Sequence, residues 1–215
     1  IVKVGDQVLK GQKIAEAGGF VSAPVYSSVS GKVKAIAPYF TPTGGKVSSI
    51  IVENDGAYTE AERLSTRPLE MLSKEEILNL IAEAGIVGMG GAGFPTRVKL
   101  SPKEPEKIEY VIANCAECEP YLTSDYRRMM EEPEKIVGCL QAAMKIFDGR
   151  AKGVLAVEDN KKDAAAKLRE AAKGIPDIEV VELKTKYPQG AERQLIFAVT
   201  GRQINSSMLP ADAGC

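Results

Sequence analysis

The 215-residue chain contains no histidine and only four cysteines. The lack of histidine excludes imidazole metal ligands, Ser-His-Asp triads and Cys-His dyads. Four cysteines in a chain of this length are too few for a disulfide scaffold. The 28 basic and 29 acidic side chains give a net charge of -1, whereas a nucleic-acid binder usually carries a basic excess. We therefore expect no nucleic-acid partner.

Long apolar runs are also lacking, and none approaches the ~20 residues that a membrane-spanning helix needs. Apolar residues make up 44% and charged residues 27%, the balance of an ordinary globular protein. The chain has neither an initiator methionine nor a signal peptide. We expect it to be a fragment of a longer protein, with one large domain or two small ones.

Residues 1–56 show no helical period. Short β-type runs alternate with glycine-containing turns, such as Gly5-Asp6 and Gly44-Gly45, roughly every 8–12 residues. This pattern predicts a small β-sandwich or barrel that packs on the segment after it, because about 55 residues are close to the lower limit for an independent core. Residues 57–72 are polar and are predicted to form a linker.

Residues 73–215 predict an α/β domain with a mainly parallel sheet. Ser73 and Glu76 form a capping box at a helix start. Strand patterns then alternate with helical ones, as expected for a parallel sheet covered by helices. The predicted strands are 108–113, 153–158 and 178–183, and the predicted helices after them are 133–147, 161–173 and 190–200.

A glycine-rich loop follows the first helix of this domain. Glycine backbones can approach a ligand closely, and consecutive amides form a nest for phosphate. Lys99 could add a cation, and Phe94 a ring for stacking. The loop follows a helix, so it fails the dinucleotide-binding fingerprint, and an ordinary turn remains the alternative. Its glycines are Gly88, Gly90, Gly91 and Gly93.

Two further loops carry polar residues at predicted strand ends, where ligands of α/β sheets bind. Asn114, Glu117 and Glu119 follow the first strand, and a solvated turn is the alternative there. Gly190 and Glu192 open a helix whose N-terminus favours anions, although Glu192 could merely complement the helix dipole.

Cys115 and Cys118 lie in the first of these loops. Three interpretations stay open for this pair: a redox disulfide, half of a metal site, or two plain thiols. A structural zinc or an iron–sulfur cluster needs about four ligands, and neither Cys139 nor Cys215 completes a known spacing.

Residues 4–14 and 23–36 resemble the barrel-sandwich hybrid of biotinyl and lipoyl carriers. Carriers need a lysine at a hairpin tip, and this chain has Ala17-Gly18-Gly19-Phe20 at the matching place. Without that amine the module cannot carry biotin or lipoate, so a structural or docking role is expected.

Three segments in this order, 88–96, 114–123 and 187–192, resemble the C subunit of the Rnf complex, a membrane-bound, ion-translocating ferredoxin:NAD oxidoreductase. The resemblance covers essentially the whole chain. It implies a hybrid module followed by a Rossmann-like α/β domain that binds FMN and NADH, similar to the flavin- and NADH-binding subunit of respiratory complex I.

The resemblance also implies roles for individual residues, with Phe94 as the ring that stacks on adenine. The positions that match FMN contacts are Gly88, Gly90, Lys99, Asn114, Glu117, Tyr187 and Gly190. The positions that match contacts to the nicotinamide nucleotide are Gly91, Phe94, Lys99, Glu119 and Glu192. Four positions depart from the family pattern: Met89 replaces an Arg, Ala116 an acid, Ala191 a Glu, and Pro102 a second aromatic residue.

The implied activity is hydride transfer between NAD(H) and FMN, with electrons exchanged with a ferredoxin-type partner through two [4Fe–4S] clusters outside this chain. Other Rnf subunits are implied partners, and the location is the cytoplasmic face of the cell membrane, held peripherally. Two alternatives stay open: an electron-transfer adaptor of a soluble reductase system, and a non-catalytic docking module.

Overall fold

The computed structural model describes residues 1–41, 44–65, 67–89 and 93–215. The chain divides into two compact units. The N-terminal unit comprises Ile1–Leu72 and Leu78–Lys99, and the α/β unit comprises Ser73–Ile77 and Leu100–Cys215. Helix α1 (Lys74–Glu83) crosses the division between them.

Antiparallel strands form the N-terminal unit. One sheet has the order β1-β4-β5, and β2 pairs with β3 in a second one. Val8, Ile14 and Val33 form the buried core between the strands, in line with the small β-module predicted for this part of the chain. The strands are β1 (Gln7–Val8), β2 (Lys13–Ala15), β3 (Val25–Tyr26), β4 (Gly31–Phe40) and β5 (Lys46–Asn54).

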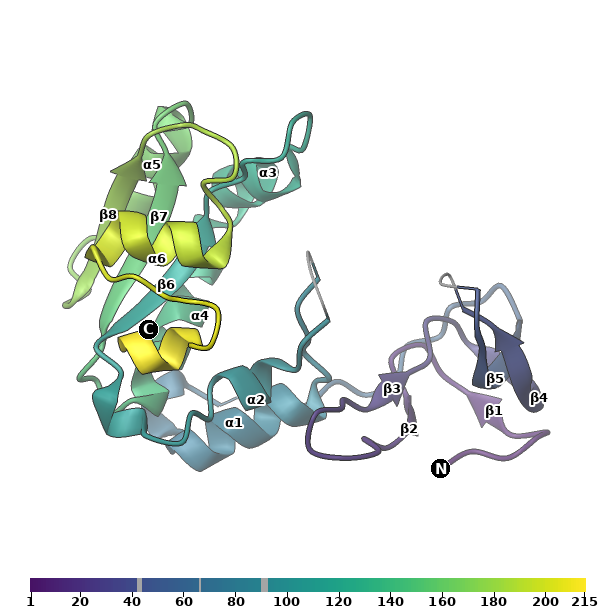
Figure 1. Ribbon diagram of the computed structural model, residues 1–215. Coiled ribbons are helices and arrows are strands. Elements are labelled where there is room, and N and C mark those ends of the chain that lie inside the picture. Colours follow the sequence, from purple (N-terminus) through teal and green to yellow (C-terminus); the bar gives the residue numbers. More distant parts are fainter. Residues whose placement is uncertain (42–43, 66, 90–92) are drawn as a thin grey trace. The chain divides into compact units, whose positions relative to one another are not determined.

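A long ribbon of β4 and β5 dominates the larger sheet (Figure 1). It starts at Gly31, whose φ of +148° and close approach to the Glu53 carbonyl require a residue without a Cβ. At the other end of the ribbon, Tyr39, Phe40 and Val47 are exposed.

The same unit holds the end of α1 and the short α2 (Thr96–Lys99), together with the 3₁₀ helix η1 (Leu69–Met71). The Tyr26 hydroxyl donates a hydrogen bond to the Glu83 carbonyl at the end of α1, and Lys13 forms an ion pair with the Glu83 carboxylate. Gly85, at φ +64°, lies so near Tyr26 that an added Cβ would come within 3.0 Å of the ring. The β-module thus contacts the segment that leads into the glycine-rich loop.

At its start, α1 has the predicted capping box. The Ser73 hydroxyl accepts the amide of Glu76 at 3.2 Å, and the Glu76 carboxylate accepts the amide of Ser73 at 2.8 Å. Two donors that a helix start leaves unpaired are satisfied in this way.

The α/β unit is built on a parallel sheet of order β6-β7-β8, which confirms the predicted fold class. Helices α4 and α5 cover one face of the sheet and α6 covers the other (Figure 1). The strands are β6 (Tyr110–Cys115), β7 (Lys152–Glu158) and β8 (Ile178–Leu183). The helices are α3 (Ser124–Glu131), α4 (Pro133–Ile146), α5 (Lys162–Ala171) and α6 (Glu192–Thr200), with 3₁₀ helices η2 (Pro105–Lys107) and η3 (Pro210–Ala213).

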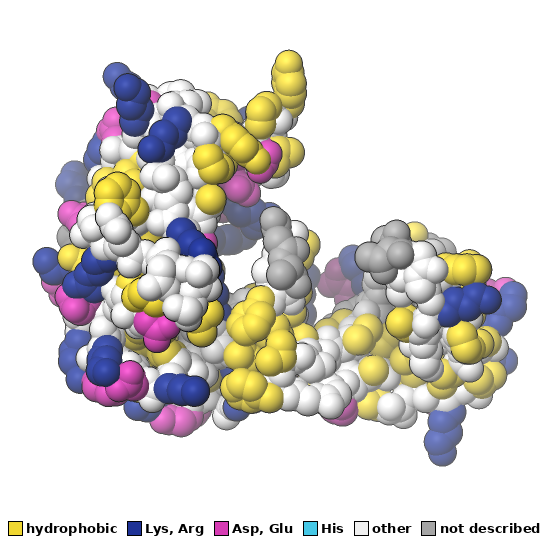
Figure 2. Space-filling view, viewed as in Figure 1, with side chains coloured by type: hydrophobic (Ala, Val, Ile, Leu, Met, Phe, Trp, Pro, Cys, Tyr) yellow, Lys and Arg dark blue, Asp and Glu magenta, His cyan; other side chains and the backbone are white. Residues whose placement is uncertain are grey.

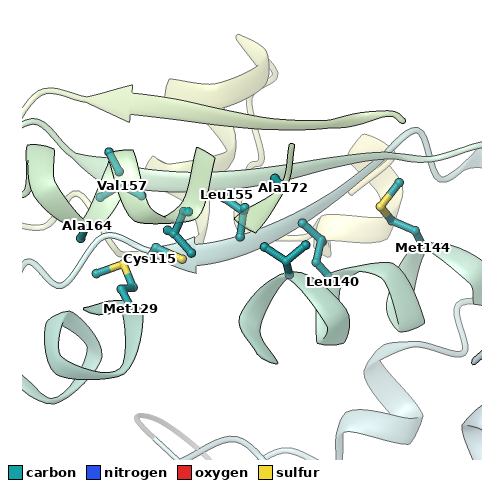
Figure 3. Packing of buried hydrophobic residues seen from close by; sticks show 11 residues of the cluster. Cys115, Met129, Leu140, Met144, Leu155, Val157, Ala164 and Ala172 are labelled. Atoms are coloured by element: carbon teal, nitrogen blue, oxygen red, sulfur yellow. The ribbon is translucent and has the colours of Figure 1, made fainter. Parts of the chain in front are cut away.

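The larger core lies between the sheet and helices α3, α4 and α5 (Figure 3). Leu155 and Val157 of β7 are fully buried there, and Cys115 of β6 lies beside Met129 of α3. Burial on both faces explains why β7 reads as a continuous apolar run rather than an alternating one. Among the described residues, no helix is long and apolar enough to cross a membrane.

Candidate functional site

Asn114 joins two loops at the carboxyl edge of the parallel sheet. Its side-chain amide donates to the carbonyl oxygen of Gly190 at 2.8 Å, and its Oδ1 accepts the amide of Ala116 at 3.2 Å. The loop after β6 and the loop before α6, which are 76 residues apart, therefore meet here. Ligands of α/β sheets bind in this position, beyond the carboxyl ends of the strands.

Gly190 lets these two loops approach closely. An added Cβ would lie inside van der Waals contact of the Ala116 carbonyl oxygen and 3.2 Å from the Cys118 sulfur. The Gly190 amide also donates to this sulfur at 3.2 Å. The close approach requires glycine, although φ at this position is not positive.

Glu117, a predicted ligand contact with a solvated turn as the alternative, is only 7% exposed. Its two carboxylate oxygens accept the amides of Asp125 at 2.8 Å and Tyr126 at 3.3 Å, at the start of α3. A carboxylate at a helix N-terminus satisfies unpaired donors and complements the helix dipole. Glu117 thus anchors α3, a helix that the sequence did not predict because its residues are mostly polar.

Two charged residues beside Glu117, the buried Glu158 and the partly buried Lys161, were also missed. Glu158 ends β7, and Lys161 precedes α5. The Lys161 ammonium lies 3.1 Å from the Glu117 carbonyl oxygen and 3.7 Å from the Glu158 carboxylate. The sequence contained a signal for Glu158, because it is a charged residue that ends the otherwise apolar predicted strand 153–158 at this edge of the sheet.

Gln189 has an unpaired acceptor next to Gly190. The residue is 2% exposed, and its Oε1 is the buried side-chain oxygen without a hydrogen-bond partner in the described part of the chain. A buried acceptor without a donor is costly. A ligand that donates a hydrogen bond would remove this cost, so Gln189 joins the candidate residues.

The other candidates of the α/β unit are exposed at the same edge. Tyr187 is 66% exposed, and the side chains of Glu119 and Glu192 face solvent. Tyr121 is completely exposed at a φ of +65° in the loop before α3. Hydrophobic and acidic side chains lie next to each other where the α/β unit carries this loop (Figure 2).

The two cysteines of this loop have different surroundings. Cys115 is buried, and burial raises its pKa to about 12. Cys118 is partly buried and accepts the Gly190 amide, and both thiols are free. In the described part of the chain, no three His, Cys, Asp or Glu side chains are grouped so that they could hold a metal ion.

The glycine-rich loop belongs to the N-terminal unit and is closed by backbone pairing. The Gly88 amide donates to the Phe94 carbonyl at 2.9 Å, and Val87 and Pro95 form an antiparallel bridge. Phe94 is 44% exposed. Lys99 ends α2 with an exposed side chain, and the predicted site residues Gly90 and Gly91 lie outside the described residues.

The structure therefore brings together Asn114, Glu117, Glu119, Tyr187, Gly190 and Glu192 at one edge of the α/β unit, and Gly88, Phe94 and Lys99 around one loop of the N-terminal unit.

Two family models match this sequence. Residues 1–57 match the RnfC barrel sandwich hybrid domain, and residues 81–215 match the Nuo51 FMN-binding domain. An NAD+-reducing [NiFe]-hydrogenase in the air-oxidized state has a similar fold, with a TM-score of 0.51 and 24% identity over 60% of this chain and 24% of that chain.

Curated relatives match the whole chain, and each is the C subunit of an oxidoreductase complex. That of the proton-translocating ferredoxin:NAD(+) oxidoreductase of Clostridium ljungdahlii is 48% identical over 100% of this chain and 47% of the relative. That of the Na(+)-translocating complex of Acetobacterium woodii is 48% identical over 100% of this chain and 48% of the relative. That of the ion-translocating oxidoreductase complex of Haemophilus influenzae is 38% identical over 100% of this chain and 33% of the relative.

The chain thus spans about half the length of the first two of these relatives and about a third of the last. The barrel sandwich hybrid domain precedes the FMN-binding domain in this chain, which is the order that the resemblance to the Rnf C subunit implies. The chain belongs to the family of the C subunits of ion-translocating ferredoxin:NAD+ oxidoreductase complexes, the RnfC family, and its α/β part belongs to the Nuo51 FMN-binding domain family.

Proposed function

We propose that the full protein is an electron-transfer subunit of an ion-translocating ferredoxin:NAD+ oxidoreductase, and that residues 1–215 contain most of its FMN and NAD(H) site. The observation that carries this proposal is the junction of Asn114 with Gly190, at the sheet edge where α/β proteins bind ligands. Full-chain relatives with this reaction in their names support it.

One feature of the junction fits a bound flavin nucleotide. The Oε1 of Gln189 is a buried acceptor in need of a donor, which a flavin ring can supply. Bound FMN would supply the redox chemistry, exchanging a hydride with NAD(H) and single electrons with an iron–sulfur domain.

The residues of this chain bind and orient the two nucleotides. We assign the flavin to Gly88, Gly90, Lys99, Asn114, Glu117, Tyr187 and Gly190. We assign NAD(H) to Gly91, Phe94, Lys99, Glu119 and Glu192. Within the flavin set, the Glu117 carboxylate acts by fixing its own loop, because both of its oxygens accept amides of α3.

The partners of the full protein then follow from the reaction. We propose that it exchanges electrons with a ferredoxin-type protein, carries two [4Fe–4S] clusters outside residues 1–215, and binds the other members of its complex at the cytoplasmic face of the membrane. The relatives' names and the two family matches support this assignment.

Replacement of Glu119 by Gln in the full-length protein tests the assignment. The change keeps size but weakens a charge-assisted hydrogen bond, at a cost of roughly 1–3 kcal/mol, so NADH affinity should fall about tenfold or more. Flavin content, measured by absorbance after anaerobic purification, should not change. Asn114→Ala should act in the opposite way and deplete FMN first.

Glu179→Gln is a matched control, because Glu179 is exposed at the amino end of β8, away from the site edge. Both NADH affinity and flavin content should stay at the wild-type level. If Glu119→Gln instead removes the flavin and leaves NADH binding intact, the two halves of the loop are wrongly assigned.

A non-catalytic docking module is the second candidate function. It is favoured by Ala116 and Ala191, which replace two acids of the family pattern, and by the engagement of Glu117 within the protein. A full-length protein that shows no flavin absorbance under anaerobic conditions would support this candidate against the electron-transfer role.

A further inference from the structure

Lys161 lies between two buried carboxylates at the site edge. Its ammonium is 3.7 Å from Oε2 of Glu158 and 4.0 Å from Oε2 of Glu117, and it donates to the Glu117 carbonyl at 3.1 Å. The lysine side chain is 12% exposed and each glutamate side chain is 1% exposed. One ammonium therefore compensates two carboxylates almost out of contact with water.

Each carboxylate in turn holds one loop of the site. Glu117 accepts the first amides of α3, which fixes the loop after β6. Glu158 accepts the amide of Lys186 at 3.3 Å, and the Lys186 carbonyl accepts the amide of Gln189 at 2.9 Å. The Glu158 carboxylate therefore holds Lys186, the first residue of the turn that carries Tyr187, Gln189 and Gly190.

Because one ammonium compensates two carboxylates, the positions of both carboxylates depend on the charge of Lys161. Buried charges persist only when they are paired and hydrogen-bonded, and the loss of one partner is strongly destabilising. Without the ammonium, two buried carboxylates would repel each other with no cation between them. They would move toward water and release the amides that they now accept.

We propose that Lys161 is a positioning residue of the site. Through Glu117 and Glu158, its ammonium fixes the positions of the loop 116–123 and the turn 186–190 relative to each other. Its role in nucleotide binding rests on the proposed function, whereas its role in holding the two loops does not. Lys161 itself is assigned no contact with either nucleotide.

Hydrogen exchange of the full-length protein tests the positioning role without any nucleotide. In Lys161→Met, the amides of Asp125, Tyr126 and Lys186 should exchange at least about tenfold faster, because their acceptors move away. The β7 segment 153–157 is the internal reference and should keep its protection, since a general loss of stability would raise exchange there too.

Two further variants separate charge from packing. Lys162→Met is the matched control, because Lys162 is the exposed neighbour at the start of α5, and its exchange should equal that of wild type. Lys161→Arg keeps the charge and should restore protection at both loops. If Lys161→Arg exchanges as fast as Lys161→Met, packing rather than charge holds the loops, and the proposal is wrong.

FMN titration of the apoprotein, followed by quenching of flavin fluorescence, tests the link to binding. Lys161→Met should bind FMN at least about tenfold more weakly than wild type and Lys162→Met. A wild-type protein that binds no FMN would contradict the proposed function, while the exchange experiment would still decide the role of Lys161. Equal exchange in Lys161→Met and Lys162→Met would overturn the inference.

Discussion

Cys115 and Cys118 are only three positions apart in the sequence, yet their side chains have very different surroundings and chemistry. Both belong to a Cys-x-x-Cys pattern, for which the sequence left three interpretations open. In the structure, Cys115 packs against Met129 in the apolar core, while Cys118 lies at the loop junction as an acceptor for Gly190. The sequence could not distinguish these surroundings, because both depend on distant segments.

We therefore expect unequal alkylation of the cysteines. The thiolate is the reactive form, and a pKa of about 12 keeps Cys115 protonated in the folded protein. Iodoacetamide at about pH 8 should label Cys139, which is exposed, and leave Cys115 unmodified until the protein unfolds. Peptide mass spectrometry measures this. Rapid labelling of Cys115 in the folded protein would contradict the burial described here.

Gly190→Ala should destabilise the protein. Its methyl group would collide with the Ala116 carbonyl and crowd Cys118, and such overpacking costs roughly 1–3 kcal/mol. Gly138→Ala is the control, because Gly138 lies within α4 and a Cβ there meets no atom within 4 Å. Denaturant unfolding should show a lower midpoint for Gly190→Ala and an equal or higher one for Gly138→Ala.

Among the elements, β7 and β8 were the most predictable from sequence and α3 the least. The strand predicted at 178–183 coincides with β8, and that at 153–158 differs from β7 by one residue. Five consecutive apolar or glycine residues define β7, whereas β8 is rich in β-branched residues between two glutamates. Helix α3 is polar, and its N-terminus is satisfied by Glu117, seven residues before Ser124. A local capping motif therefore could not reveal it.

Two hydrogen bonds join the residues that follow β7 and β8, and their contribution to the stability of the fold depends on pH. The Thr185 hydroxyl donates to Asp159 at 2.6 Å and its amide donates at 3.0 Å, and these bonds lower the pKa of Asp159 below its ordinary value. Because the folded-state pKa is depressed, this contribution to stability is present above the unfolded pKa. It is lost as the pH falls through the folded pKa.

Thr185→Val removes the hydroxyl donor and should raise the pKa of Asp159 toward its ordinary value. Carbon NMR titration of the Asp159 carboxyl measures this shift, and the stability difference from wild type should vanish in acid. Thr200→Val is the control, because it removes a hydroxyl that donates to the Ile196 carbonyl and not to Asp159. An unchanged Asp159 pKa in Thr185→Val would show that other groups hold the pKa down.

At the scale of the whole molecule, the β-module without a carrier lysine contacts the segment that enters the glycine-rich loop, within the N-terminal unit. Sequence predicted the module and its missing lysine, and it assigned a structural or docking role in general terms. It could not indicate that Tyr26 contacts Glu83 and Gly85, because such pairing depends on packing between distant segments.

Tyr26→Ala should loosen residues 84–89 and 93–99. The variant loses both the hydrogen bond to the Glu83 carbonyl and the ring that covers Gly85. Limited trypsin digestion should cleave after Arg97 and Lys99 faster than in wild type, because proteases cut locally unfolded backbone. Tyr39→Ala, on the exposed end of β4, is the control and should leave cleavage unchanged. Equal cleavage in both variants would show that the β-module does not stabilise the segment.

The charge cluster of Glu117, Glu158 and Lys161 has an evolutionary consequence. A lineage that replaces the lysine with a neutral residue keeps two uncompensated carboxylates, so a viable descendant must also neutralise a glutamate. Substitutions at these three positions should thus be inherited together rather than one at a time. In an alignment of the family, position 117 should covary with positions 158 and 161, although it lies on a segment of the chain far from them.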